Sequence, residues 1–380
     1  MKVLFLCNLV PAKWGAYEAF VGALGAHLRA TGDALAVGFA GPPGEDVAVR
    51  FRDAGVRWDV IPGWVAADGT VRPWAVLRGG RALLRAEQPD VVAVHFGNEL
   101  PSLALIVAAR LLGRCRARWV WHQRQQIADP APLARVLSRI RLAALGFDHF
   151  VVSYEGGRRS LLLRGIPERR VTVIYNALED ATPARPHGWL REALGVAPDT
   201  LIVTNVGWLV KRKRIHLAIA AFAEASAGTS AVLAIVGKGP EREALQAAAE
   251  QAGVAERVRF LGQRDDVRDI LAESDLLVHT SEAETCTNVV LEAMAAGKPV
   301  VMADAGAARE QVDDGASGFV VGVQATTDLA QRLRTVLADP ALRARFGREA
   351  RTRWERLFRL DESVRRHRDC YQALVERGRI

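Results

Sequence analysis

The chain has 380 residues, half of them hydrophobic, so it is long enough to bury two cores of about 150 to 200 residues each. Its 51 lysine and arginine residues exceed its 43 aspartate and glutamate residues, which gives a net charge of +8 and favours anionic partners. No aromatic-interleaved basic motif and no zinc-ligand spacing accompanies this charge, which argues against a nucleic-acid-binding protein. Phosphate groups and acidic lipid are the partners that remain.

The cysteine pattern and the amino-terminal sequence both indicate a cytoplasmic protein. The four cysteines are far apart and form no CxxC pair, so we expect free thiols in a reducing compartment. Residues 1–11 carry one lysine and a short apolar run that ends at Pro11, which is typical of a buried first strand and not of a signal peptide. The longest apolar stretch, 103–112, is interrupted by Arg110 and is too short to span a bilayer.

Strand and helix patterns alternate through the first half of the chain. The hydrophobic pattern predicts strands at 3–6, 34–39, 56–60, 90–95, 118–122 and 149–153. It predicts helices at 17–31, 74–86, 101–112 and 133–146. This alternation is typical of an α/β fold with a parallel, doubly wound sheet.

The same alternation restarts after a polar, proline-rich stretch at 179–187. Strands are predicted at 201–206, 231–236, 258–261, 276–279, 299–302 and 318–321, with helices between them. Residues 328–380 read as arginine-rich helices without a strand. We therefore predict two Rossmann-like domains, 1–180 and 181–357, with about 358–380 packing back on the first domain.

The segment TSEAETCTNVVLEAMAAGKPVV predicts a loop, then a helix ending at Gly297, then a buried strand. Glu284 lies in the loop and Glu292 in the helix, so two carboxylates, which accept hydrogen bonds from hydroxyl groups, flank the helix start. The first backbone N–H groups of a helix attract phosphate. We expect a nucleotide site here, in which the helix-start amides are those of Thr287, Asn288 and Val289.

Five segments in order resemble a family-four retaining glycosyltransferase of the GT-B fold. They read NVGWLVKRKRIHLAI, LAIVGKGPE, RFLGQRDDV, HTSEAETCTNVVLEAMAAGKPVV and GAAREQVDDGASGFVV, and the resemblance runs over nearly the whole chain, most strongly over 203–322. It implies two Rossmann-like domains whose parallel sheets face a central cleft, with an acceptor-side first domain and a nucleotide-sugar-binding second domain. It also implies transfer of a sugar from a nucleotide diphosphate sugar to an acceptor hydroxyl with retention.

The resemblance assigns the donor-binding residues of the second domain. Glu284 corresponds to the glutamate that contacts donor sugar hydroxyls, Glu292 to the one that holds the ribose, and Lys213 to the lysine that grips the diphosphate. Trp208 occupies the position of the family's arginine, and Trp cannot pair with a diphosphate. Compensation by Lys211, Arg212 or Arg214, an unusual donor, and weak activity are the alternatives left open.

The resemblance also assigns residues of the first domain, and one further loop of the second, that approach the donor. Gly15 and Ala16 fall on the family's Gly-Gly loop, whose backbone N–H groups approach the donor phosphate. His122 falls on the histidine that faces the anomeric centre, with His95 at the corresponding end of the preceding strand. Arg264 and its neighbour Asp265 lie where the family's loop meets the nucleobase.

Two further segments resemble structural elements of the family. Tyr175, Asn176 and Ala177 match a segment at the interdomain hinge. The loop that contains Gly306, Ala307 and Glu310 matches the family's G-G-x-x-E loop, in which Glu310 is expected to be structural.

No Asp-x-Asp pair occurs, so we expect no cofactor and no essential metal, with Lys213, the helix dipole and backbone N–H groups meeting the diphosphate charge. The expected partners are a nucleotide sugar donor and a glycan or lipid-linked glycan acceptor, because the family commonly serves bacterial envelope polysaccharide or glycolipid synthesis. Residues 110–141 contain eight arginines and one acid, and Arg135 and Arg139 suit a peripheral contact with the acidic inner face of the plasma membrane.

Two other functions fit parts of the sequence. A nucleotide-sugar epimerase of the same architecture would convert a lone donor without an acceptor. A non-catalytic glycosyltransferase-like subunit would suit the departures at Trp208, Ala16 and Ala307.

Overall fold

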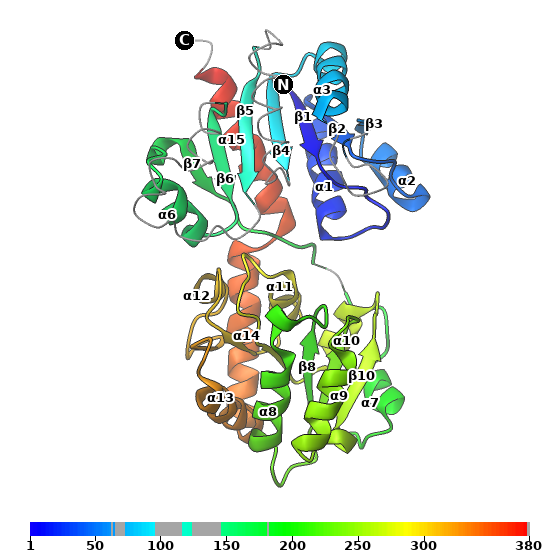
Figure 1. The fold of residues 1–380 in the computed structure, drawn as a ribbon, viewed down its shortest axis with the longest axis vertical. Coiled ribbons are helices and arrows are strands. Elements are labelled where there is room, and N and C mark those ends of the chain that lie inside the picture. Colours follow the sequence, from blue (N-terminus) through cyan, green and yellow to red (C-terminus); the bar gives the residue numbers. More distant parts are fainter. Residues whose placement is uncertain (62–63, 65–72, 96–115, 124–145, 181, 378–380) are drawn as a thin grey trace. The chain divides into compact units, whose positions relative to one another are not determined.

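The computed structural model describes the chain except for residues 62–63, 65–72, 96–115, 124–145, 181 and 378–380. The chain forms two compact units (Figure 1). The N-terminal unit contains Met1–Tyr175 and Leu360–Ile380, and the C-terminal unit contains Asn176–Arg359. The division thus falls between Tyr175 and Asn176, a few residues before the predicted boundary at 180.

The N-terminal unit is built on a parallel sheet with the strand order β3-β2-β1-β4-β5-β6-β7. Its strands are β1 (Lys2–Cys7), β2 (Ala34–Phe39), β3 (Val56–Val60), β4 (Val91–His95), β5 (Arg118–Gln123), β6 (His149–Val152) and β7 (Val171–Val173). Its described helices are α1 (Ala16–Ala30), α2 (Glu45–Asp53), α3 (Pro73–Glu87), α6 (Glu155–Leu163) and α15 (Leu360–Glu376). The helices α1 and α15 lie side by side (Figure 1).

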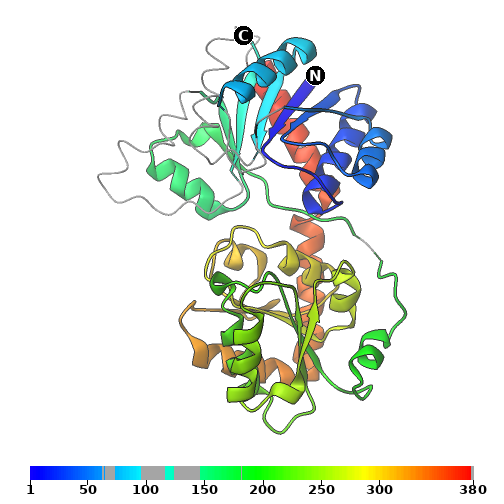
Figure 2. The same ribbon diagram turned by 45° about the vertical axis from the view of Figure 1, so that its right-hand side comes forward.

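The C-terminal unit is a parallel sheet with the order β10-β9-β8-β11-β12-β13. Its strands are β8 (Ile202–Val206), β9 (Val232–Val236), β10 (Val258–Gly262), β11 (Leu276–His279), β12 (Val300–Ala303) and β13 (Gly318–Val321). Its helices are α7 (Trp189–Leu194), α8 (Ile215–Ala225), α9 (Arg242–Gln251), α10 (Val267–Glu273), α11 (Asn288–Ala295), α12 (Ala308–Gln311), α13 (Thr326–Ala338) and α14 (Pro340–Leu357). Figure 2 shows helices on both faces of this sheet.

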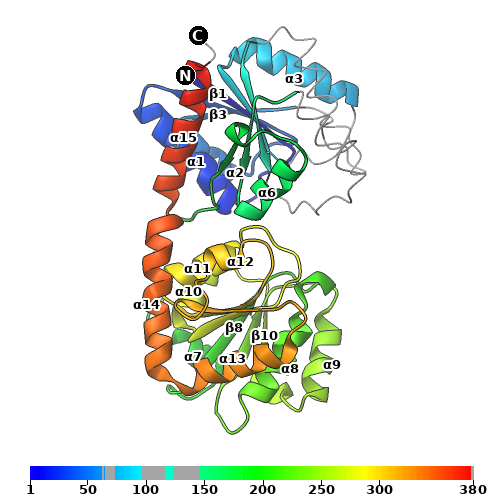
Figure 3. The same cartoon turned by 90° about the vertical axis from the view of Figure 1, so that its left-hand side faces the viewer.

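Side-chain alternation along β9 explains the two layers of the C-terminal core. Leu233 and Ile235 belong to the cluster under α8, α9 and α13, whereas Val232 and Val236 belong to the cluster under α7 and α10. Because successive strand residues point to opposite faces, a strand buried on both sides is apolar throughout, as β9 is. Figure 3 shows α14 and α11 on one face and α8 on the other.

The predicted fold class is confirmed, and most predicted strands match the structure within a residue or two. The prediction missed β7, α2 and α6. The strand β7 has only three residues at the sheet edge, too few for a clear alternation. The predicted helices at 101–112 and 133–146, and with them Cys115, Arg135 and Arg139, lie outside the described residues.

Candidate functional site

The predicted donor-binding residues of the C-terminal unit gather at the edge where its strand order reverses. The strands β8 and β11 are neighbours, and successive connections lead away from them in opposite directions. In such sheets the loops after the two central strands leave a crevice that binds ligands. Here these loops are residues 207–214, which contain Lys213, and 280–287, which contain Glu284.

The loop after β8 is held by a second loop that needs glycine. A Cβ atom on Gly237 would lie 1.8 Å from the Gly207 oxygen, and Gly237 has a φ of 147°. The Leu209 N–H donates to the Lys238 carbonyl at 2.9 Å. These two backbone contacts flank Trp208, whose residue surface is 68% exposed. The indole is therefore displayed to solvent and is not part of the core.

Glu284 lies at the centre of a charged cluster formed by loops that are distant in sequence. The Lys213 ammonium is paired with the Glu284 carboxylate, and His279 Nε2 lies 3.4 Å from Glu284 Oε1. The Thr280 hydroxyl donates to the Lys213 carbonyl at 2.9 Å, so the lysine backbone is fixed to the end of β11. The structure thus brings together the predicted pair Lys213 and Glu284 and adds His279, which the sequence analysis missed. A histidine at the end of a strand, five residues before Glu284, was the available signal.

The surroundings keep Glu284 ionised. Burial by itself would raise the pKa of this carboxyl, but the hydrogen bond with His279 and the positive charge of Lys213 lower it to about 2. Burial is also the main reason why the pKa of His279 lies below its ordinary value, so the imidazole is neutral. Glu284 therefore accepts hydrogen bonds throughout the physiological range and is not a proton donor.

The other cations of this loop point to different neighbours. Arg212 Nη1 lies 4.0 Å from Glu284 Oε1 and 3.2 Å from the Ala283 carbonyl oxygen. Arg214 adopts a left-handed conformation with a φ of 50°, and its guanidinium donates to the Val323 carbonyl and to Gln324. Arg214 is therefore engaged away from Glu284, whereas Arg212 lies beside it.

The Glu284 loop is supported by the loop that contains Gly306. A Cβ atom at Gly306 would lie 2.2 Å from the Glu284 carbonyl oxygen and 2.5 Å from that of Thr285, and Gly306 has a φ of 60°. The next residue, Ala307, donates its N–H to the Thr285 carbonyl at 2.8 Å. Only glycine allows the two backbones to approach this closely.

The start of α11 is held by a residue that the sequence analysis missed. Gln311, which is fully buried, accepts a hydrogen bond from the Thr287 N–H at 3.0 Å and donates to the Thr287 carbonyl at 2.9 Å. The Thr287 amide is therefore occupied by Gln311 in this structure, and its contact with a phosphate stays a prediction. The amides of Asn288 and Val289 belong to the first turn, where N–H groups have no acceptor within the helix. No sequence signal distinguished Gln311.

The hinge-like segment also meets this helix start. Asn176 Nδ2 donates to the Cys286 carbonyl at 2.8 Å and to Asn288 Oδ1 at 3.2 Å. Its side chain thus fixes the beginning of the C-terminal unit to the loop between Glu284 and α11.

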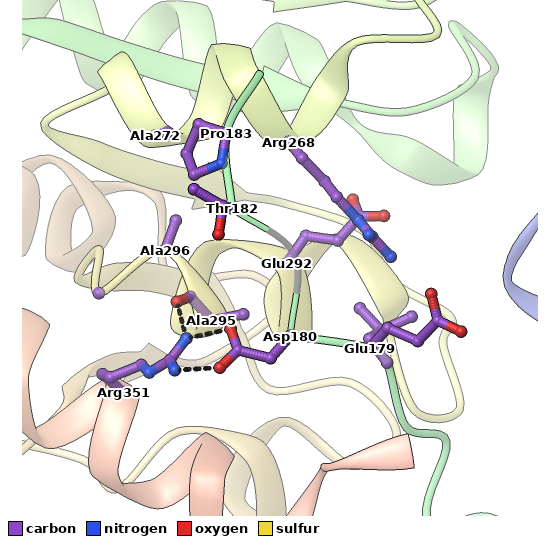
Figure 4. A pocket seen from close by; sticks show the side chains of 12 residues that line it. Glu179, Asp180, Thr182, Pro183, Arg268, Ala272, Glu292, Ala295, Ala296 and Arg351 are labelled. Atoms are coloured by element: carbon purple, nitrogen blue, oxygen red, sulfur yellow. Dashed lines mark hydrogen bonds and ion pairs between the residues drawn. The ribbon is translucent and has the colours of Figure 1, made fainter. Parts of the chain in front are cut away.

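Glu292 lies in a different environment, on the wall of a cavity of about 500 Å³ (Figure 4). The cavity lies between α10, α11, α14 and the chain segment from 178 to 183. The figure shows Glu292 beside Arg268, and Asp180 hydrogen-bonded to Arg351 at 2.8 Å. Its wall is formed by Leu178, Glu179, Asp180, Thr182, Pro183, Arg268, Ala272, Glu292, Ala295, Ala296, Gly297 and Arg351.

Burial raises the pKa of Glu292 to about 7, although the positive charge of Arg268 opposes the rise. Near neutral pH this carboxyl therefore exists in both protonation states. Both forms can accept a hydrogen bond from a ribose hydroxyl, but the ionised form is the stronger acceptor. The role of Glu292 at a ribose stays a prediction.

Arg264 is fixed by its own loop. Its guanidinium donates to both carboxylate oxygens of Asp266, at 2.8 and 2.6 Å, and this pairing raises the pKa of Arg264. Two of the guanidinium N–H groups of Arg264 are thus bonded to Asp266. The predicted contact of Arg264 with a nucleobase stays a prediction.

In the N-terminal unit, Gly15 lies at the end of the loop after β1, and Ala16 is the first residue of α1. Gly15 is the N-cap residue, and a Cβ atom on it would lie 3.0 Å from Glu18 Oε2. Burial raises the pKa of Glu18, while hydrogen bonds from the backbone of Glu18 and Gly15 oppose the rise. A glutamate three residues after the N-cap reaches back to the cap amide in a capping box. The Gly15 amide therefore faces a carboxylate, a capping signal that the sequence analysis missed.

His122 is the second-last residue of β5 and lies inside a group of buried aromatic rings. Its Nε2 atom lies 2.8 Å from the Tyr371 hydroxyl of α15, and its ring stacks on His95 with the centroids 4.0 Å apart. Both histidines are almost fully buried. The structure thus places His95 beside His122 on the neighbouring strand, as expected, while the contact of His122 with an anomeric centre stays a prediction.

Among the described residues, no group of three or more histidine, cysteine, aspartate or glutamate side chains is arranged to hold a metal ion. No helix in this part of the chain has the length and apolarity needed to cross a membrane.

Comparison with known proteins agrees with this arrangement. Residues 190–353 match the family described as glycosyl transferases group 1, and residues 15–177 match the glycosyl transferase 4-like domain. The chain is 30% identical over 316 residues to 2-deoxystreptamine N-acetyl-D-glucosaminyltransferase of Streptomyces fradiae, covering 75% of this chain and 74% of the relative. The chain therefore belongs to the group 1 glycosyltransferases.

Other relatives match over a shorter range. The chain is 35% identical over 156 residues to the lipopolysaccharide core biosynthesis glycosyltransferase LpsE of Rhizobium meliloti, covering 41% of this chain and 45% of that protein. The chain spans about half the length of the curated relatives that it matches most strongly. Anabaena HepE in complex with UDP has a TM-score of 0.80 at 22% identity and covers 98% of this chain and 100% of HepE, which establishes the GT-B fold.

Proposed function

We propose that the protein is a retaining, metal-independent glycosyltransferase that moves a sugar from a nucleotide diphosphate sugar to an acceptor hydroxyl. The observation that carries this proposal is the cluster of Glu284, Lys213 and His279 beside the start of α11, at the point where the strand order reverses. It combines an ionised acceptor for sugar hydroxyls with a cation and helix amides for phosphate.

In the proposed reaction the bond between the anomeric carbon and the phosphate oxygen breaks, and its electron pair stays on the nucleoside diphosphate. The acceptor oxygen bonds to the anomeric carbon on the same face, and its proton moves to a departing phosphate oxygen. Lys213 stabilises the charge that develops on the leaving group. Glu284 and Glu292 position the sugar and the ribose and take no proton from the acceptor.

Metal independence is supported by the chemistry of the side chains. Lys213, Arg212 and the amides of Asn288 and Val289 are the groups that would meet the diphosphate charge. The related chains that act in lipopolysaccharide core synthesis and on 2-deoxystreptamine support a glycan, a lipid-linked glycan or another hydroxyl-bearing acceptor.

A nucleotide panel followed by a turnover assay tests the proposal. UDP, GDP, ADP, CDP and dTDP are first screened for a rise in Tm, since a ligand that binds only the native state stabilises it. The corresponding nucleotide glucose and nucleotide N-acetylglucosamine donors are then supplied with 2-deoxystreptamine or a purified lipopolysaccharide core oligosaccharide, and the anomeric configuration of the product is read by NMR. We expect an α-linked product from an α-linked donor, with or without EDTA.

Other outcomes reject specific parts of the proposal. Isomerisation of the donor without an acceptor would identify an epimerase, and nucleotide binding without turnover with any acceptor would indicate a binding subunit. Inverted configuration would exclude the retaining mechanism. Loss of turnover in EDTA that added Mg²⁺ or Mn²⁺ restores would exclude metal independence.

We also propose a cytoplasmic location with peripheral contact to acidic lipid. The support is the net charge of +8 and the arginine-rich stretch 110–141. Flotation with phosphatidylglycerol vesicles and with neutral phosphatidylcholine vesicles tests the contact, and equal partitioning would contradict it.

A further inference from the structure

The cluster at Glu284 contains two cations for one carboxylate. The Lys213 ammonium is in direct contact with Glu284, and Arg212 Nη1 lies 4.0 Å from the same oxygen. The neighbouring His279 is neutral because it is buried. The cluster therefore carries a net positive charge, and Lys213 is already neutralised by the carboxylate in the structure.

Arg212 has a fixed backbone and an accessible side chain. Its carbonyl oxygen accepts a hydrogen bond from the Glu282 N–H at 3.1 Å and one from the Ser281 hydroxyl at 3.3 Å. Its side chain is 55% exposed, compared with 14% for Lys213. Its Nη1 donates one exposed hydrogen bond to the Ala283 carbonyl at 3.2 Å, which leaves the other N–H donors of the guanidinium for an incoming anion.

The other candidates in this loop are less suitable. The Arg214 guanidinium is held by Val323 and Gln324. Trp208 offers only one N–H donor and no charge. Lys211 is exposed and belongs to the same short 3₁₀ helix, Lys211–Lys213, but no ion pair joins it to Glu284 in the part of the chain that the structure describes.

We propose that Arg212 binds the sugar-bearing phosphate of the donor diphosphate, beside Lys213. The position follows from this proximity, because Arg212 Nη1 lies 4.0 Å from Glu284 Oε1 and is therefore on the sugar side of the donor if Glu284 holds the sugar. This inference rests on the proposed function. When the bond to the anomeric carbon breaks, the electron pair moves to an oxygen of this same phosphate, and a guanidinium donates paired hydrogen bonds to such an oxyanion.

The experiment compares nucleotides that differ by one phosphate. Binding of UDP and UMP is measured by calorimetry for the wild type, Arg212→Ala and the matched control Lys211→Ala, which removes a cation from the same turn. UDP is the first probe because HepE binds it, and another nucleotide pair replaces it if the Tm panel selects another base. Arg212→Ala is expected to weaken the diphosphate roughly tenfold or more, and the monophosphate less than about threefold.

A second-site variant separates a phosphate contact from a general disturbance of the loop. Trp208→Arg in the Arg212→Ala background places a guanidinium on the neighbouring exposed loop, and we expect it to restore part of the diphosphate affinity and the kcat. Lys211→Ala should bind both nucleotides as the wild type does.

Equal losses for the diphosphate and the monophosphate in Arg212→Ala would overturn the inference, as would a diphosphate loss no larger than that of Lys211→Ala. Failure of Trp208→Arg to improve diphosphate binding in the Arg212→Ala background would also overturn it. If the wild type binds no nucleoside diphosphate, the proposed function itself fails, so the two failures are distinguishable.

Discussion

Glu284 and Glu292 belong to one short segment, yet the C-terminal unit places them in opposite electrostatic environments. Glu284 touches a lysine and lies beside a neutral histidine, and its pKa falls to about 2. Glu292 lies on a cavity wall where burial outweighs the charge of Arg268, and its pKa rises to about 7. Two identical side chains therefore differ in protonation near neutral pH, because the pKa is set by the charges and the solvent around each carboxyl.

The surroundings of Glu284 and Glu292 also differ in the contacts that hold them in place. The Glu284 loop is fixed by the close backbone approach of Gly306 and by the Ala307 N–H, and the Thr280 hydroxyl holds the Lys213 carbonyl beside it. The Glu292 cavity is bounded in part by residues 178–180, 182 and 183, and Asp180 forms a partly exposed ion pair with Arg351 of α14. We expect changes around Glu284 to affect turnover most, and changes around Glu292 to affect nucleotide affinity and its pH dependence.

The largest effect is expected for Lys213→Ala. This change removes the cation that faces the leaving phosphate, so kcat should fall by roughly 10² to 10³-fold, as for loss of an oxyanion-stabilising donor. It also leaves Glu284 without its partner, which should lower the free energy of unfolding by about 1–3 kcal/mol. Steady-state kinetics and urea denaturation measure the two effects, and a kcat close to that of Lys211→Ala would contradict the role of Lys213.

The Lys213 prediction also has a pH signature. Glu284 has a folded-state pKa below its unfolded value, so its contribution to stability is present above about pH 4.5 and is lost as the pH falls toward 2. Lys213→Ala should reduce this acid-dependent loss, as measured by denaturation between pH 2.5 and 6.

Gly306→Ala tests whether the Glu284 loop depends on close backbone approach. The new Cβ atom would collide with the Glu284 carbonyl and would impose a left-handed conformation on alanine, at a cost of about 2–4 kcal/mol in stability. The matched control is Gly315→Ala, where φ is also positive, at 81°, but no atom lies within 4 Å of the new Cβ. Thermal denaturation of both variants should show the larger loss at Gly306, and equal losses would reject the steric explanation.

Glu292→Gln tests the other carboxyl through its pH dependence. The folded state keeps a proton that the unfolded chain releases, so stability should fall by about 1–3 kcal/mol as the pH rises from 4.5 to 7 and then level off. Nucleotide affinity should rise over the same upper range, because the ionised carboxyl is the stronger acceptor.

Glutamine keeps the size of the side chain but does not titrate, so Glu292→Gln should remove both slopes. Glu292→Ala should in addition weaken nucleotide binding by about 1–3 kcal/mol. A folded Glu292→Ala variant with unchanged nucleotide affinity would argue against the ribose role.

The smallest effect is expected for Asp180→Ala. Asp180 and Arg351 form an ion pair on the cavity wall, but their side chains are 44% and 31% exposed, so solvent weakens the attraction. We expect a stability loss of about 0.5–1 kcal/mol and a nucleotide affinity within about twofold of the wild type, measured by denaturation and calorimetry. A larger loss of affinity would mean that the segment 178–183 organises the cavity around Glu292.

Much of the fold was predictable because its strands are apolar throughout and its helices are amphipathic. The strands β2, β3, β11 and β13 begin and end where the hydrophobic pattern placed them. The two carboxylates were found from the loop and helix pattern of their segment, and Lys213 from the resemblance to the family. Three residues were missed: Gln311, His279 and Glu18. Gln311 contacts a neighbouring loop, His279 lies at a strand end and Glu18 faces a helix cap, and the hydrophobic pattern of the sequence indicates such contacts only weakly.

The sequence alone determined the alternation of strands and helices, the two Rossmann-like sheets and the segment that carries Glu284 and Glu292, because periodicity and glycine placement are local properties. Only the tertiary structure decided what each carboxyl meets. Lys213 and Glu284 lie 71 positions apart in the chain and come together because β8 and β11 are neighbours in the sheet. The burial of each carboxyl and the charges nearest to it depend on such long-range pairing. They keep Glu284 ionised at neutral pH and let Glu292 titrate near neutral pH.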